Sequence, residues 1–203
     1  MQESKDSSAI ENIVTTQNEL YRAIMSPEDA PHMSSATKEV LMYREALYSG
    51  LDLPEKKGLT ANTLVSIMQK LKNTTAEVRR GTGTRLVNPV TKETIYTPPE
   101  GKELIRNKLT ALEKFIHHDD ESIDPLIRMA LMHYRFEAIH PFADGNGHTG
   151  RIMNVLYLVH MDLLPLPVLY LSSFIIRHKS EYYRLLREVT EKENWLRQTY
   201  CNL

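Results

Sequence analysis

The chain has 203 residues, of which 41% are hydrophobic and 25% charged, and its formal net charge is −1. This composition excludes a disordered chain, and the near-neutral charge excludes nucleic acid or an anionic membrane as a partner bound through bulk charge. The single cysteine, Cys201, excludes a disulfide framework and favours a reducing compartment. The N-terminus is polar and no apolar run reaches the ~18 residues of a membrane span, so we expect a soluble cytoplasmic protein.

Apolar residues recur at helical spacing along most of the chain, which predicts an all-α fold. The predicted helices cover residues 34–50, 59–73, 101–118, 124–139, 150–161 and 180–195. Their N-cap candidates are Ser34 or Ser35, Thr60, Asp124 followed by Pro125, and Ser180. The helix at 150–161 is apolar on most sides, which indicates a buried central helix.

Residues 84–99 depart from this pattern. Two short runs that favour β-structure, 85–87 and 94–96, are separated by Asn88-Pro89 and followed by Pro98-Pro99. They predict a small β-hairpin inserted in the helical fold. Exposed insertions of this kind often carry binding function.

The segment HPFADGNGHTGR, residues 140–151, has the residues that phosphoryl or nucleotidyl transfer needs. Glycines around Asn146 allow consecutive amides to converge on an anion, and a helix starting near Gly150 would point its positive end at that nest. Arg151 adds a fixed cation. Asp144 is an oxygen ligand suited to Mg²⁺ on a phosphate chain, and His140 is suited to take a proton from an attacking hydroxyl.

This segment resembles the Fic family motif, which reads His-Pro-Phe, any residue, Asp or Glu, Gly-Asn-Gly-Arg, two residues, Arg. The preceding HYRFEA (133–138), the IYTPP at 95–99 and the EYYRLL at 181–186 also look like family segments, and the resemblance covers about residues 5–195. It implies a Fic-type helical bundle with a β-hairpin flap. It also implies transfer of AMP from ATP, with Mg²⁺, to a Ser, Thr or Tyr hydroxyl of a protein.

The resemblance assigns a role to each residue of the motif. His140 is the general base, Asp144 holds Mg²⁺, and Arg151 meets the terminal phosphate, while Phe142 anchors the loop in the core. The anion hole is lined by Gly145, Asn146 and Gly147. Tyr182 and Tyr183 would lie by the adenosine, with ordinary aromatic packing as the alternative. The flap residues expected to pair with the target backbone are Leu86, Val87 and Asn88.

A second motif lies at the N-terminus. By themselves, Ser8 and Glu11 have the spacing of a capping box at a helix start. In the Fic class with an N-terminal inhibitory helix, however, the pattern is Ser or Thr, three residues, Glu, then Gly or Asn, which Ser7, Glu11 and Asn12 match. The resemblance therefore implies that Glu11 pairs with Arg151 and occupies the place of the terminal phosphate. It divides the chain into an inhibitory region, 1–35, and a Fic core, 36–203.

One position departs from the family motif, because His148 stands where the motif has its first arginine. Histidine is shorter and lacks the permanent charge and fork of arginine. It can donate one hydrogen bond to a phosphate, or two when protonated, so we expect weaker triphosphate binding or slower transfer, with activity favouring lower pH.

Two alternatives to autoinhibited AMP transfer stay open. One keeps the fold with another donor, or removes AMP with water activated by Glu11. The other is a degenerate member that binds nucleotide without turnover. Self-modification and a homodimer are also open.

Overall fold

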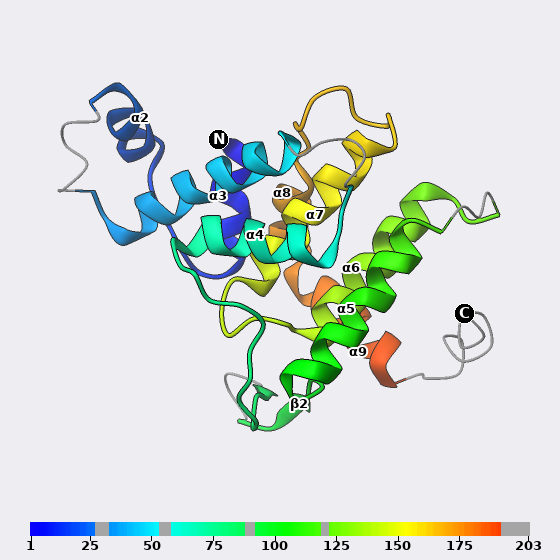
Figure 1. The fold of residues 1–203 in the computed structure, drawn as a ribbon. Helices are drawn as coiled ribbons and strands as arrows, with labels where there is room; N and C mark the ends of the chain where they lie inside the picture. The colour runs from blue at the N-terminus through cyan, green and yellow to red at the C-terminus, as the bar shows by residue number, and fades with distance from the viewer. Residues whose placement is uncertain (27–32, 53–57, 88–91, 119–121, 192–203) are drawn as a thin grey trace.

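Helix α7 (Asn146–His160) lies at the centre of the bundle, with α6 (Pro125–Ile139) beside it and α3 (Ser35–Leu51) and α4 (Ala61–Lys72) against it (Figure 1). The computed structural model describes residues 1–26, 33–52, 58–87, 92–118 and 122–191. From Asn146 to Leu158 nearly every α7 side chain is buried, which confirms the prediction of a buried central helix. The other described helices are α1 (Gln2–Ile10), α2 (Gln17–Met25), α5 (Lys102–Ile116), α8 (Leu171–Arg177) and α9 (Lys179–Glu191).

The helix starts follow local capping chemistry in three predicted places. The side chains of Ser34, Thr60 and Asp124 each accept a hydrogen bond from a backbone N–H in the first turn, which satisfies a donor that the helix itself cannot pair. Ser180 was the wrong choice for α9, since that helix already begins at Lys179. Among the described helices none is both long and apolar enough to cross a bilayer.

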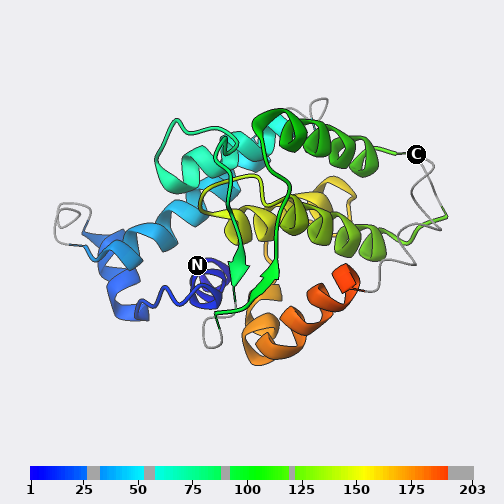
Figure 2. The ribbon, with the colours of Figure 1, turned by 90° about the horizontal axis from the view of Figure 1, so that it is seen from below.

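The predicted hairpin is present as β1 (Leu86–Val87) and β2 (Thr94–Tyr96), which pair antiparallel with Leu86 opposite Tyr96. Its strands project from the side of the bundle that faces the viewer in Figure 2, and they lie below α5 in Figure 1. The Tyr96 hydroxyl donates to the carbonyl of Ala138, 2.9 Å away at the end of α6, so the base of the flap is attached to the helix that leads into the motif. Leu86 and Val87 are exposed, and Asn88 lies outside the described residues.

Phe142 anchors the motif loop in the core, as the sequence predicted. It is 1% exposed, and its ring lies 6.1 Å from that of Phe136, centroid to centroid. Phe136 belongs to α6, so this pair fixes the loop to the helix before it. Both rings sit in the same buried cluster as Ile152 of α7.

Replacing Phe142 with alanine should lower the free energy of unfolding by about 3–5 kcal/mol, because it leaves a cavity in the core. Urea denaturation measures the loss. Phe174→Ala is the matched control, since Phe174 is 55% exposed. Equal losses in the two variants would contradict the anchoring role.

Candidate active site

The motif joins α6 to α7 through two left-handed residues. His140 caps the C-terminus of α6 with φ 47°, and Gly145 precedes α7 with φ 80°. The expected start of the helix near Gly150 was wrong: α7 begins four residues earlier, at Asn146. The cost of glycine in a helix is conformational entropy, and two glycines, Gly147 and Gly150, lie within α7. His148 and Arg151 consequently lie three residues apart on one helix face.

The loop is closed by the side chain of Asn146. Its Oδ1 accepts from the Phe142 N–H at 2.9 Å, and its Nδ2 donates to the Phe142 carbonyl at 2.8 Å. Asn146 thus holds the loop in shape with its side chain. Asp144 Oδ1 accepts from the Gly145 N–H at 2.7 Å, which further fixes the turn into α7.

Arg79 holds His140 in place from outside the motif. Its Nε donates to the His140 carbonyl at 2.8 Å, and its backbone N–H donates to the Pro141 carbonyl at 2.9 Å. Burial and the nearby Arg79 charge lower the pKa of His140, although a hydrogen bond to the Glu137 carbonyl acts the other way. A neutral imidazole is the form that can accept a proton. Sequence reasoning did not select Arg79.

Glu11 pairs with Arg151, as the N-terminal motif predicted. Glu11 Oε1 lies 2.6 Å from Arg151 Nη2, while Ser7 accepts from Arg151 through its hydroxyl (2.7 Å) and its carbonyl (3.1 Å). Ser8 and Glu11 lie at the C-terminal end of α1, where Glu11 is the C-cap residue. The interpretation of these two residues as a capping box at the start of a helix was therefore wrong. Asn12 follows with φ 64°, the left-handed conformation that ends many helices and that asparagine tolerates.

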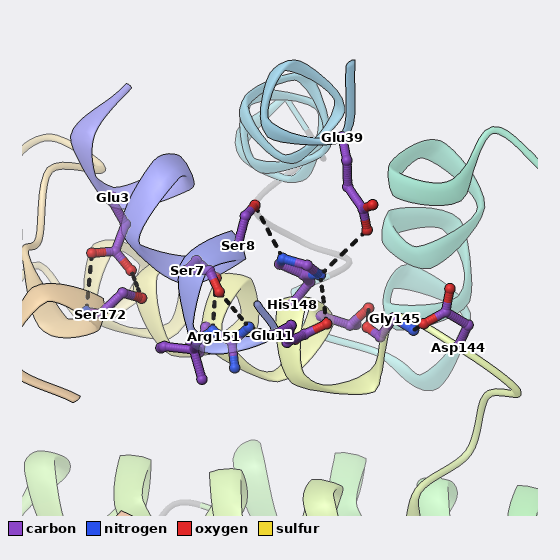
Figure 3. Close-up of polar contacts among 12 residues, drawn as sticks. Glu3, Ser7, Ser8, Glu11, Glu39, Asp144, Gly145, His148, Arg151 and Ser172 are labelled. Atoms are coloured by element: carbon purple, nitrogen blue, oxygen red, sulfur yellow. Dashed lines mark hydrogen bonds and ion pairs between the residues drawn. The ribbon is translucent and has the colours of Figure 1, made fainter. Parts of the chain in front are cut away.

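The Glu11 carboxylate rests on the first turn of α7 (Figure 3). A Cβ atom on Gly147 would lie 2.5 Å from Glu11 Oε1 and 2.8 Å from Arg151 Nη1. Glycine at this position therefore makes room for an anion against the helix N-terminus. The structure brings Gly147, Arg151 and the Glu11 carboxylate together at the start of α7.

His148 is fully buried beside this carboxylate. Its Nε2 is hydrogen-bonded to the Ser8 hydroxyl at 3.2 Å, and its Nδ1 lies 3.1 Å from Glu11 Oε2. Its ring meets the buried Tyr43 edge to face, with centroids 5.6 Å apart. His148 therefore holds α1 in this state through both nitrogens.

The charges of the site favour an ionised Glu11. Burial by itself would raise the pKa of Glu11, but the hydrogen bond and charge of His148, and then Arg151, outweigh it and lower the pKa to about 2. Burial would likewise lower the pKa of Arg151, and the Glu11 charge raises it instead. Each group thus favours the charged form of the other.

Asp144, the expected metal ligand, pairs with Lys72 of α4, whose Nζ is 2.8 Å from Asp144 Oδ2. The same ammonium lies 2.5 Å from Glu39 Oε1. The part of the chain that the structure describes has no cluster of three metal-ligating side chains. A single exposed carboxylate nevertheless fits Mg²⁺, which is commonly bound by one or two carboxylates together with substrate phosphates.

The start of α1 is attached to α8 by a buried pair that the sequence did not reveal. Glu3 Oε1 accepts from the Ser172 hydroxyl at 2.5 Å, and Oε2 accepts from the Ser172 N–H at 3.2 Å. Lys179 Nζ donates to the Ile10 carbonyl at 2.6 Å at the other end of the helix. Helix α1 is therefore held at both ends.

The predicted adenosine-side tyrosines differ in their surroundings. Tyr182 donates or accepts a 2.7 Å hydrogen bond with His133 Nε2 and contacts the Tyr183 ring. Tyr183 is about half exposed. Glu137 lies nearby with Oε1 buried and without a hydrogen bond, and burial raises its pKa to about 7. Sequence reasoning did not select Glu137.

Glu11→Gln should lower the free energy of unfolding at pH 7 by about 2 kcal/mol, the typical value of a hydrogen bond to a charged group. Because the pKa of Glu11 falls from its usual 4.5 to about 2 on folding, its contribution is fully present above pH 4.5 and is lost as the pH falls toward 2. Urea titrations of both proteins at several pH values test this. A stability difference that is already absent at pH 5 would contradict it.

The chain is similar to known proteins in both sequence and fold. A sequence model of the Fic/DOC family matches residues 58–158, and one of the Fic/DOC family N-terminal region matches residues 1–52. A probable protein adenylyltransferase from Aquifex aeolicus is 30% identical over 96 residues, which is 47% of this chain and 27% of the relative. A protein adenylyltransferase Fic from Nematostella vectensis is 30% identical over 93 residues, which is 46% of this chain and 20% of the relative.

Solved structures agree on the fold. A Fic family protein from Desulfovibrio desulfuricans superposes with a TM-score of 0.75 at 23% identity, covering 94% of this chain and 57% of that one. A Fic-1 fragment from Caenorhabditis elegans has a TM-score of 0.65 at 22% identity, covering 91% and 56%. The chain thus spans only part of the length of each of these proteins.

Proposed function

The chain belongs to the Fic/DOC family, and we propose that it is a protein adenylyltransferase held inactive by its own α1. It would transfer AMP from ATP to a Ser, Thr or Tyr hydroxyl of a protein. The proposal is supported by relatives named protein adenylyltransferases. Cytoplasmic location, self-modification, a homodimer and the division at residue 35 stay predictions.

One observation supports the proposal: a carboxylate lies where the motif is expected to bind phosphate. The Glu11 carboxylate rests over Gly147 and pairs with the buried Arg151. A terminal phosphate presents the same negative oxygens to the same guanidinium and helix N-terminus. Glu11 and ATP would therefore compete for one place.

The residues of the loop are suited to different roles in the transfer reaction. The target hydroxyl oxygen would form a bond to the α-phosphorus of ATP, while the bond from that phosphorus to the bridging oxygen breaks and pyrophosphate leaves. His140, neutral and held by Arg79, would take the hydroxyl proton. Arg151 would stabilise the phosphate charge. Asp144 would hold Mg²⁺, which when bound neutralises phosphate charge.

The flap is suited to present the target. Leu86 and Val87 are exposed, and β1 pairs only with β2 among the described strands. A free strand edge can take up an extended peptide by backbone hydrogen bonds. The Tyr96 hydroxyl attaches the flap to Ala138, two residues before His140, so a paired peptide would lie near the proposed base.

Glu11→Gly should raise transfer of α-labelled AMP to protein by about tenfold or more, because a competing interaction of ~1.4 kcal/mol changes occupancy tenfold. Incubation with labelled ATP and Mg²⁺, followed by gel separation, measures it, with self-modification detected in the same lanes. The matched control adds His140→Ala to Glu11→Gly, which should reduce labelling roughly 100- to 10,000-fold. Unchanged labelling in Glu11→Gly would contradict autoinhibition, and transfer of only γ-label or of another nucleotide would replace the proposed donor.

The Glu11→Gly protein should stay active somewhat below neutral pH. His140 must be neutral to act as a base, and its pKa is lowered from its usual 6.5. We expect the rate at saturating ATP to hold from pH 7.5 to about 6.5 and to fall only at lower pH. A rate that already halves between pH 7.5 and 7 would contradict the assigned base.

A further inference from the structure

Six ionisable side chains, basic and acidic in alternation, line the N-terminal end of α7. Glu11 links Arg151 to His148, as described above, and His148 Nδ1 also lies 3.9 Å from Glu39 Oε1 (Figure 3). Glu39 then binds Lys72 at 2.5 Å, and Lys72 binds Asp144 at 2.8 Å. The one lysine of this series comes from α4, outside the motif.

Position 148 carries a histidine and therefore lacks the permanent positive charge that an arginine would supply there. The imidazole there is 0% exposed, and its two nitrogens face the Ser8 hydroxyl and the Glu11 carboxylate. A histidine offers at most a single positive charge, and only when protonated, whereas arginine is always charged and forked. Binding of a triphosphate calls for a further cation nearby.

Lys72 lies where such a cation would be needed. Its stem crosses the turn into α7, since a Cβ atom on Gly145 would lie 3.1 Å from Lys72 Cε. Its Nζ contacts the carboxylate beside the nest, and its side chain is 19% exposed, so it is close to the surface without being fully solvated. Lysine is a compact cation with three donors on a flexible stem, well suited to phosphate oxygens.

We propose that Lys72 is a phosphate-binding residue that supplies the cation missing at position 148. The inference rests on the proposed function, because it presumes a nucleotide in the Glu11 site. Glu39 positions the ammonium through their 2.5 Å contact. When phosphate oxygens enter, the three donors of Lys72 allow it to bind them while Glu39 keeps its place.

Two other roles for Lys72 give different results. A structural ion pair with Asp144 would affect folding and leave nucleotide binding unchanged. A lysine that only competes with Mg²⁺ for Asp144 would leave metal-free ATP binding unchanged when removed. Phosphate binding by Lys72 requires that ATP affinity depend on it without metal.

The test measures ATP and AMP dissociation constants by calorimetry in EDTA, with every variant in the Glu11→Gly background. Lys72→Ala should weaken ATP binding about tenfold, equivalent to ~1.4 kcal/mol, and leave AMP binding nearly unchanged. Lys72→Arg should retain ATP binding. The matched control is Lys70→Ala on the same helix, where Lys70 makes only a surface contact of 3.7 Å with Glu45; it should change nothing.

A second substitution that replaces the lost cation gives a sharper test than removal of Lys72 by itself. His148→Arg should restore ATP binding to Lys72→Ala, and removal of the Glu11 side chain gives the longer residue more room. Equal ATP affinity with and without Lys72 would overturn the inference. So would a gain in ATP affinity from His148→Arg that is the same whether residue 72 is lysine or alanine. Failure of the Glu11→Gly protein itself to bind ATP would instead overturn the proposed function on which the inference rests.

Discussion

The pair between Glu11 and Arg151 is the interaction on which the site depends. Arg151 is 3% exposed and always charged, and a buried charge requires a counter-ion. Within the described residues the carboxylate of α1 provides it, supported by Ser7 at 2.7 Å. In the proposed function, a nucleotide phosphate would take the same place. The two states would then share one buried cation, so binding of nucleotide and docking of α1 would oppose each other.

The helix arrangement reinforces this competition. The C-terminal end of α1, where carbonyls carry partial negative charge, meets the N-terminal end of α7, where amides carry partial positive charge. His148 adds a second contact to Glu11, so a residue that departs from the family motif helps to hold Glu11 in place. Glu3, bound to Ser172, keeps the far end of α1 in place. Opening would require all of these contacts to separate together.

Much of the fold followed from local sequence, because its signals act over a few residues. Thr60 accepts the predicted capping bond, and the hairpin strands fall where β-favouring runs predicted them. The pairing of Glu11 with Arg151, 140 positions away, was predicted correctly. That prediction came from the family resemblance and not from local physics. The start of α7 was misplaced because glycines suggest a loop, whereas Gly147 and Gly150 both lie within the helix.

The partners that sequence did not reveal are pairs between distant elements. Lys72 reaches Asp144, Arg79 reaches His140 and Glu3 reaches Ser172, and no spacing rule relates residues so far apart. Each is a single charged side chain whose partner is set by the way distant segments of the chain pack together. Such contacts tune a site whose main residues the motif already contains.

The central claim is that Glu11 occupies the place of the terminal phosphate. The most direct measurement compares the affinities of ATP and ADP for the unaltered protein and for Glu11→Gly. If the claim holds, the unaltered protein binds both nucleotides about equally, and removing Glu11 strengthens ATP binding far more than ADP binding. An equal gain for both nucleotides, or no gain for either, would contradict it.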